Sequence, residues 1–155
     1  MTAFICNGML GKLCTFLRMC GFDAAYSNKG TAILVQARRE DRILLTRNTN
    51  FVDRDRVFFL SSTDPLEQLH EVIEKYHMKD EMQLFSRCLE CNVLLEPVEK
   101  TAVQSRIPYY TFKHYSDFSE CPQCCRVYWK GSHYKKMIDD IAGALGTNGS
   151  PKDKQ

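Results

Sequence analysis

Two Cys-x-x-Cys pairs constrain the fold of this sequence more than any other feature. Cys88 and Cys91 form the first pair, and Cys121 and Cys124 form the second. A two-residue gap lets both sulfurs of a pair face one ion, so two such pairs can complete a tetrahedral zinc site. A segment as short as residues 86–131 has too little core to fold alone, and bound metal would supply much of its folding free energy. The pattern predicts a small zinc-binding module over residues 86–131.

Other uses of these cysteines stay open at the level of the residues. Two disulfides would require an oxidising compartment, and a redox Cys-x-x-Cys would need a strand-to-helix context that this segment lacks. Cys125 follows the second pair directly, at a position where glycine commonly allows the turn, and could replace Cys124. His114 and His133 are further candidates for one ligand position. The predicted metal ligands are Cys88, Cys91, Cys121 and Cys124, with Cys125 as a spare thiol.

The first 85 residues alternate between short apolar runs and helical patterns. Runs typical of buried strands occupy residues 3–6, 22–26, 42–46 and 57–60. Apolar residues at helical spacing cover residues 9–20, 31–40 and 65–77. Strands that alternate with helices form parallel sheets through right-handed crossovers. The sequence therefore predicts an α/β domain over residues 1–85, in which Cys6, Cys14 and Cys20 are small buried core residues.

Asparagine follows two of the predicted strands, because Asn7 comes after Phe4, Ile5 and Cys6, and Asn48 comes shortly after Leu45. In α/β sheets the working surface lies at the carboxyl ends of the strands, beside the point where strand order reverses. Asparagine is also a common turn residue. We therefore expect both residues at the functional edge of the sheet, although a turn role alone would explain them equally well.

Composition and charge exclude few classes of function. The formal net charge is +2 and the isoelectric point is about 8.1, which permits nucleic-acid binding without requiring it. No apolar stretch approaches the roughly 18 residues of a membrane span. The N-terminus also lacks the pattern of a secretory signal. These features favour a cytoplasmic protein without a membrane partner.

The last residues predict one more helix and a tail. Residues 132–145 place Met137, Ile138, Ile141 and Leu145 on one apolar face, so we expect this helix to dock on the body of the protein. Residues 146–155 are polar and are expected to be disordered.

Five segments of the sequence together carry a family resemblance. In chain order they are GMLGKLCTFLRMCGFDAAY, RILLTRN, DPLEQL, RCLECN and CPQCCRVYWKGSHYKKM. They resemble the Mut-seven carboxy-terminal RNase family over residues 4–138. The resemblance implies an α/β fold with a PIN-like parallel sheet and flanking helices, followed by a small zinc ribbon. It also implies RNA cleavage with Mg²⁺ or Mn²⁺ held by carboxylates at strand ends.

The sequence departs from the family where that divalent ion would bind. Family members carry aspartate at the positions of Asn7 and Asn48, and acids before the second helix, where this chain reads SNKGTA. Asparagine offers a carbonyl oxygen but no negative charge, and hard cations require anionic oxygen. Nearby acids have other interpretations: Asp64 as a helix cap, Asp23 as a turn residue, and Asp53 and Asp55 as parts of a solvated loop. We expect catalysis to be weak or lost.

Two functions are consistent with this pattern. In the first, the chain is a metal-dependent ribonuclease in which Arg47 and Lys12 steady the phosphoryl charge. In the second, it is an inert module, held together by structural zinc, that binds RNA or a protein partner. Stacking and phosphate contacts to RNA are expected at basic and aromatic residues of the ribbon, namely Arg87, Arg126, Tyr128, Trp129 and Lys130. The alternative role of Tyr128 and Trp129 is to pack the small ribbon core and its seam with the first domain.

Overall fold

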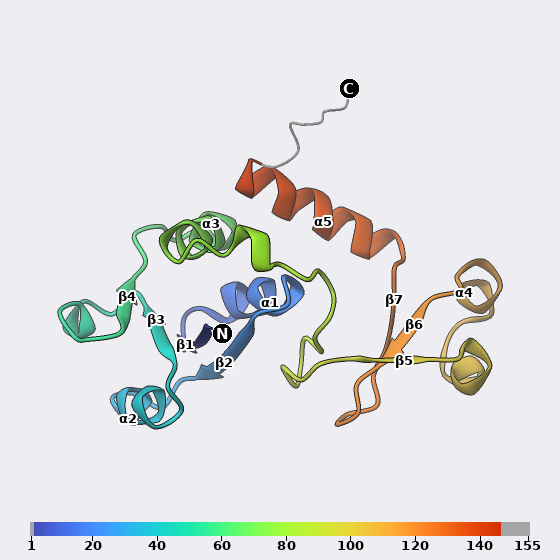
Figure 1. The fold of residues 1–155 in the computed structure, drawn as a ribbon, viewed down its shortest axis with the longest axis horizontal. Coiled ribbons are helices and arrows are strands. Elements are labelled where there is room, and N and C mark those ends of the chain that lie inside the picture. The colour runs from blue at the N-terminus through green and yellow to red at the C-terminus, as the bar shows by residue number, and fades with distance from the viewer. Residues whose placement is uncertain (1, 147–155) are drawn as a thin grey trace. The chain divides into compact units, whose positions relative to one another are not determined.

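The computed structural model describes residues 2–146 (Figure 1). Of the expected disordered tail, all residues after Gly146 lie outside the described range. The chain divides into two compact units, one ending at Asn92 and the other beginning at Val93. The predicted boundary lies after residue 85, whereas in the structure the first cysteine pair belongs to the first unit.

A four-stranded parallel sheet forms the centre of the first unit. Its strands are β1 (Ala3–Asn7), β2 (Asp23–Ser27), β3 (Ile43–Thr46) and β4 (Val57–Phe59), in the order β2-β1-β3-β4. The predicted α/β class and parallel sheet are confirmed. The chain places β2 on one side of β1 and then crosses to β3 on the other side. The carboxyl ends of β1 and β3 therefore form the topological switch point, where α/β proteins place ligands.

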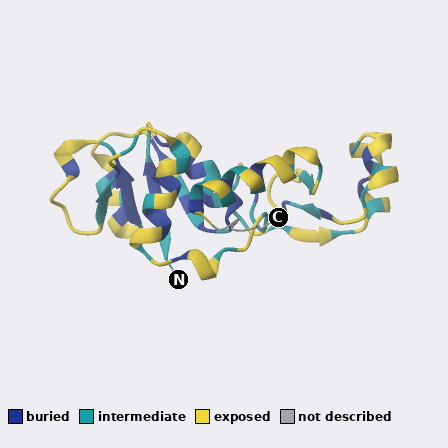
Figure 2. Ribbon diagram, turned by 90° about the horizontal axis from the view of Figure 1, so that it is seen from above, coloured by how far each residue is buried: buried dark blue, intermediate teal, exposed yellow. Residues whose placement is uncertain are grey.

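Three helices cover the sheet. They are α1 (Gly11–Met19), α2 (Ala32–Arg39) and α3 (Pro65–Lys75). Helices α1 and α3 pack together on one face, and α2 contacts β1 and β3 on the other (Figure 1). Ile5 and Leu44 of the central strands pack with Ile33 of α2 and with Phe51. Because both faces are covered, the central strands are apolar on both sides, and Figure 2 shows them as the most buried part of this unit.

The predicted core cysteines of the first unit are buried as expected. Cys6, Cys14 and Cys20 have almost no solvent exposure. Burial raises the pKa of Cys20 to about 12, so its thiol stays protonated at neutral pH. These three residues act as small apolar side chains in the core.

After α3 the chain returns past the end of α1. The short 3-10 helix η2 (Lys79–Glu81) leads into this segment. The amide of Gln83 then donates to the carbonyl of Cys20, and the amide of Phe85 donates to the carbonyl of Met19. Gly21 has a left-handed backbone with φ of 93°, and a Cβ there would lie 2.5 Å from the carbonyl oxygen of Gln83. Glycine is therefore required at this crossing.

The second unit has a three-stranded antiparallel sheet. Its strands are β5 (Glu96–Val98), β6 (Phe118–Glu120) and β7 (Val127–Trp129), in that order. The 3-10 helix η3 (Lys100–Arg106) and helix α4 (Tyr109–His114) connect β5 to β6. Helix α5 (Ser132–Leu145) follows β7 and ends at Gly146, which has a left-handed φ of 67°. Met137, Ile141 and Leu145 of α5 are buried, and the docking of this helix on the body stays a prediction.

Candidate functional site

The side chain of Asn7 is fixed at the switch point by two hydrogen bonds. The backbone amide of Gly8 donates to Oδ1 of Asn7 at 2.8 Å, and Nδ2 of Asn7 donates to Oγ1 of Thr46 at 2.8 Å. Because the Gly8 amide can only donate, it must face the oxygen of Asn7, and the NH₂ group must face Thr46. Thr46 is fully buried at the end of β3, beside β1. The amide of Asn7 is therefore held in one orientation across two strand ends.

The link to Asn48 runs through the same threonine. The backbone amide of Asn48 donates to Oγ1 of Thr46 at 2.9 Å. The side-chain Oδ1 of Asn48 accepts from the amide of Asn50 at 2.9 Å and caps the 3-10 helix η1 (Thr49–Phe51). Thr46 thus joins the two asparagines, which the sequence analysis did not foresee. The only signal for it in the sequence was a hydroxyl at the end of an otherwise apolar strand.

The end of β2 completes this edge of the sheet. Ser27 is buried, and its hydroxyl accepts from the amide of Lys29 at 3.3 Å. A Cβ at Gly8 would lie 2.8 Å from the Cβ of Asn28, so the loops after β1 and β2 touch. Within the described chain, the residues that end β1, β2 and β3 include no carboxylate. The edge presents amides and hydroxyls instead.

Arg47 and Lys12, the predicted phosphate ligands, lie in different surroundings. The guanidinium of Arg47 donates to the carbonyl of Leu60 and lies 5.6 Å from the ring centroid of Phe59. It is therefore held along the end of β4. Lys12 lies exposed in the first turn of α1.

The acids that follow β4 are bound by the turn before α3. Asp64 caps α3 by accepting from the amide of Glu67 at 3.3 Å, so its predicted role is confirmed. The carboxylate of Glu71 accepts from the amides of Ser61 and Ser62 at 3.0 and 3.2 Å. These contacts organise the β4–α3 turn.

Asp23 is not the turn residue that the sequence suggested. It begins β2, forms a 2.7 Å ion pair with Arg42, and accepts a 2.7 Å hydrogen bond from Nδ2 of Asn92. Burial opposes its ionisation, but the hydrogen bonds from Arg42 and Asn92 outweigh burial and lower its pKa. The sequence missed this role because Arg42 and Asn92 are remote along the chain.

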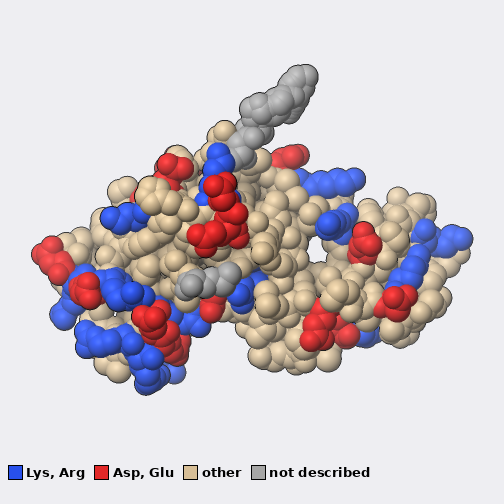
Figure 3. All heavy atoms as spheres, viewed as in Figure 1, with Lys and Arg blue, Asp and Glu red and all other residues tan. Residues whose placement is uncertain are grey.

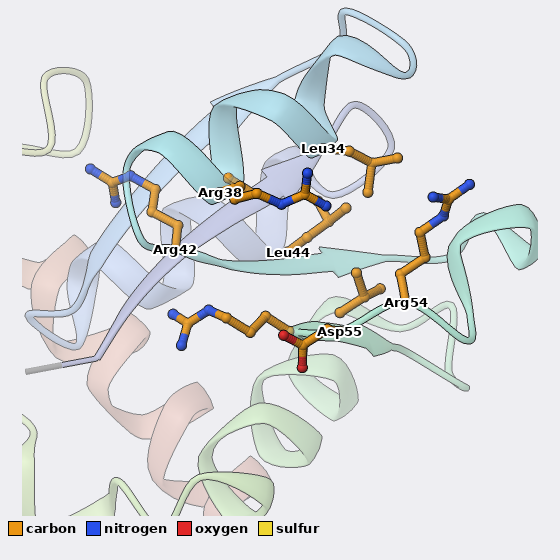
Figure 4. Close-up of a pocket in the computed structure, with 9 residues that line it drawn as sticks. Leu34, Arg38, Arg42, Leu44, Arg54 and Asp55 are labelled. Carbon is orange, nitrogen blue, oxygen red and sulfur yellow. The ribbon is translucent and has the colours of Figure 1, made fainter.

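Asp53 and Asp55 lie in an exposed loop before β4, and Asp55 lines a pocket of about 210 Å³ (Figure 4). The pocket also contains apolar side chains from α2 and β3, such as Leu34 and Leu44. Two of its arginines are in ion pairs, Arg42 with Asp23 and Arg56 with Asp41. Its strand residues come from the starts of β3 and β4, so the pocket lies at the opposite edge of the sheet from the asparagines.

The four predicted cysteine ligands come together. The Sγ atoms of Cys88, Cys91, Cys121 and Cys124 all lie within 4.8 Å of one another. Cys88 and Cys121 are buried, whereas Cys124 is exposed. Backbone amides donate to the sulfurs, from Cys91 to Cys88 at 3.4 Å and from Cys124 to Cys121 at 3.3 Å. Such donors stabilise thiolate charge, so the group is positioned to bind a metal ion.

Each cysteine pair is followed by a residue with a left-handed backbone. Asn92 after the first pair has φ of 65°, and Cys125 after the second has φ of 66°. The amide of Cys125 donates to the carbonyl of Cys121 at 2.9 Å, which closes the turn. Cys125 therefore occupies the position at which glycine is commonly found, and Cys124 is the member of the metal-binding group.

The first cysteine pair is held firmly in the first unit. Arg18 donates to the carbonyl of Leu89 at 2.8 Å, and Arg87 donates to the carbonyls of Gly21 and Asn92 at 3.0 and 2.7 Å. Oδ1 of Asn92 accepts from the amide of Ala24 in β2 at 3.1 Å. The turn that carries Cys88 and Cys91 is thus preorganised by the edge of the parallel sheet.

The remaining candidates of the second unit differ in exposure. Trp129 is half-buried, and its ring lies 6.1 Å from that of Phe118. Lys130 is exposed, with its Nζ 5.7 Å from the ring of Tyr134, and Arg126 is exposed. His114 lies on α4 and His133 on α5, and neither belongs to the metal-binding group.

A parallel α/β sheet followed by a four-cysteine ribbon defines this chain as a nuclease-like α/β protein with a metal-binding module. It belongs to the Mut7-C RNase domain family, whose model matches residues 2–141. Searches among curated proteins and among solved structures found no significant match. In the described part of the chain, no helix is long and apolar enough to cross a membrane.

Proposed function

We propose that this chain binds RNA as a member of the Mut7-C RNase family and that its metal-dependent cleavage is weak or lost. The family match supports the proposed RNA binding, and the observation that carries the proposed loss of cleavage is the Asn7–Thr46–Asn48 arrangement at the switch point. Both amide oxygens already accept a backbone N–H bond, and neither carries negative charge. These positions therefore do not fit a hard divalent ion such as Mg²⁺ or Mn²⁺.

The ion for the cysteine group is proposed to be zinc with a structural role. Four thiolates at Zn–S distances of about 2.3 Å lie roughly 3.8 Å apart in a tetrahedron. The observed group, with every sulfur within 4.8 Å of the others, needs only a small contraction to match. A Cys₄ zinc site keeps two negative charges, and arginines 18, 87 and 106 donate to backbone carbonyls next to the cysteines. Thiolate ligands suit a reducing compartment such as the cytoplasm.

The RNA contact is proposed to involve the exposed basic residues of the ribbon. Arg126 and Lys130 are exposed, and half-buried Trp129 lies beside Lys130 in the chain. Arg87 serves a structural role, because its guanidinium is bound to the carbonyls of Gly21 and Asn92. Arg47 and Lys12 would contact phosphate only if the switch point still receives RNA.

Cleavage of labelled single-stranded RNA with added Mn²⁺ tests the proposed loss of catalysis. The wild type should cleave slowly or not at all, and Asn7→Asp with Asn48→Asp should cleave faster, because carboxylates return to the switch point. Adding Asn28→Asp tests whether an acid at β2 is also needed. Asn50→Asp is the control for added charge, since it places one new carboxylate in the neighbouring exposed turn, whereas the double variant adds two at the strand ends. Wild-type cleavage as fast as that of the double variant would contradict the proposal.

A protein-interaction module remains the second candidate, and RNA binding separates the two. If the chain binds RNA, affinity should fall as salt rises, because counterions are released from phosphate. No detectable binding of single-stranded RNA at about 50 mM salt, where such contacts are strongest, would favour the protein-interaction role.

A further inference from the structure

Helix α4 of the second unit exposes two neighbouring aromatic rings. Tyr109 is 73% exposed and Tyr110 is 64% exposed, whereas Thr111, the next residue of the helix, is buried. Neither tyrosine ring is therefore part of the core of the second unit. Two exposed rings on consecutive residues provide apolar surface to which a partner could bind.

A cation or imidazole accompanies each of these rings one helical turn later. The ring of His114 stacks on that of Tyr110, with centroids 4.0 Å apart and an interplanar angle of 22°. Nζ of Lys113 lies 5.8 Å from the centroid of Tyr109. Both pairs have the i, i+4 spacing that brings side chains together on a helix surface. Nδ1 of His114 lies 2.9 Å from the carbonyl oxygen of Tyr110, which fixes the imidazole ring. The exposed side chains of these two pairs are called here the α4 platform: Tyr109, Tyr110, Lys113 and His114.

The segment that carries the α4 platform has basic side chains and no acidic ones. Residues 100–116 contain no aspartate or glutamate, and the nearest acids in the sequence are Glu99 and Asp117. Lys100 of η3 adds a further cation, with its Nζ 4.4 Å from the ring of Phe112. Arg106 is bound instead to Glu120 at 2.8 Å. Figure 3 shows Lys and Arg side chains gathered where Figure 1 labels α4, with acidic side chains beside them.

We propose that the α4 platform binds single-stranded RNA by stacking bases on Tyr109 and Tyr110, with Lys113 and Lys100 facing the phosphates. Single-stranded nucleic acid supplies both chemistries that this surface offers, since every base has an apolar face and every phosphate a negative charge. An A-form duplex keeps its bases stacked on one another and leaves no base face for the rings. This inference rests on the proposed RNA binding. It places the RNA contact on helix α4 and not at Trp129 and Lys130.

Binding of a fluorescently labelled single-stranded RNA of about 12 nucleotides, at about 50 mM salt, tests the platform. Tyr109→Ala with Tyr110→Ala should weaken binding roughly tenfold or more, because each lost stack is worth several-fold in affinity. Tyr109→Phe with Tyr110→Phe should keep nearly full affinity, since the rings remain. Leu94→Ser is the matched control, because Leu94 is a 58% exposed apolar residue of the same unit, outside the platform.

The outcomes separate the platform from the proposed function. Zinc content and circular dichroism first establish that each variant is folded. If the wild type binds RNA and the double alanine variant binds equally well, the platform is wrong while the proposed function stands. In that case Trp129→Ala with Lys130→Ala should weaken binding instead. If the wild type does not bind, both proposals are overturned. A duplex RNA that competes as well as the single strand would also contradict the stacking mode.

Discussion

Nδ2 of Asn7 donates a 2.8 Å hydrogen bond to Oγ1 of Thr46, across the carboxyl ends of two neighbouring parallel strands. In the PIN-like pattern that the family resemblance implies, this is where an aspartate would hold a divalent ion. An amide donates where a carboxylate could only accept, so the bond suits a site without metal. The same threonine oxygen accepts from the amide of Asn48.

Thr46→Val should destabilise the first unit. Valine keeps the shape of the buried side chain but removes the acceptor for Asn7 and Asn48, and an unsatisfied buried donor costs about 1–3 kcal/mol. Urea denaturation should show a decrease of about 1–2 kcal/mol in the free energy of unfolding. The decrease stays below the upper limit because Asn48 is exposed, so that water can replace part of the lost hydrogen bonding. Thr46→Ser keeps the hydroxyl and is expected to lose less. Equal stability of wild type and Thr46→Val would show that the network is not needed.

Much of the fold could be predicted because its signals are local. Apolar runs at strand spacing, the Asp64-Pro65 helix start and the two cysteine pairs each identify an element from adjacent residues. The role of Asp23 could not be predicted, because its partners are far away in the sequence. Arg42 and Asn92 reach Asp23 only after β2 has joined the parallel sheet and residues 83–92 have packed against this unit. For the same reason the sequence did not predict that Arg87 donates to the carbonyls of Gly21 and Asn92.

Of the candidate sites, the metal site could be predicted from local sequence, and the exposed tyrosines of α4 could not. Four cysteines with fixed spacing predict a metal site without any knowledge of the fold, because cysteine thiolates in such pairs are typical metal ligands. Exposure of Tyr109 and Tyr110 could not be predicted, because a six-residue helix has too few residues to define a buried face from sequence. Residue type predicted the chemistry, and tertiary contacts decided which residues are available for it.

Cys125→Gly should keep the metal and stabilise the second unit. A left-handed backbone costs a residue with a Cβ about 1 kcal/mol relative to glycine, and Cys125 has φ of 66°. Cys124→Ser should instead lose the metal. Zinc content by atomic emission, with about one zinc per chain expected for wild type and Cys125→Gly, checks both. Loss of zinc from Cys125→Gly but not from Cys124→Ser would reverse the assignment of the fourth ligand.

Cys91→Ser should disturb more than the ribbon. The turn that carries Cys91 is hydrogen-bonded to α1 through Arg18 and to β2 through Asn92. If the turn loses its metal and becomes mobile, these hydrogen bonds become exposed to water. Amide hydrogen exchange should rise in β2 as well as in residues 93–131. Cys20→Ser alters a cysteine outside the metal site and controls for general destabilisation. Unchanged protection of β2 in Cys91→Ser would mean that this turn is stable without metal.

Asp23→Asn should destabilise the protein at neutral pH but not in acid. The pKa of Asp23 is lowered on folding, so its stabilising effect is complete above the ordinary aspartate pKa of about 4 and is lost as pH falls below it. The difference in unfolding free energy between wild type and variant should therefore narrow between about pH 5 and pH 3. A difference that stays constant over this range would mean that the charge of Asp23 contributes nothing.

The central claim, that amides have replaced a divalent-metal site at the switch point, is tested most directly by melting with and without Mn²⁺. Asn7→Asp with Asn48→Asp should melt below the wild type in the absence of metal, because two like charges are added at this edge of the sheet and residue 7 no longer donates to Thr46. Mn²⁺ binds only the folded variant and should raise its Tm by about 4 °C or more, while the wild type should hardly respond. If Mn²⁺ raises the Tm of the wild type as much as that of the double variant, the asparagine site still binds metal and the account is wrong.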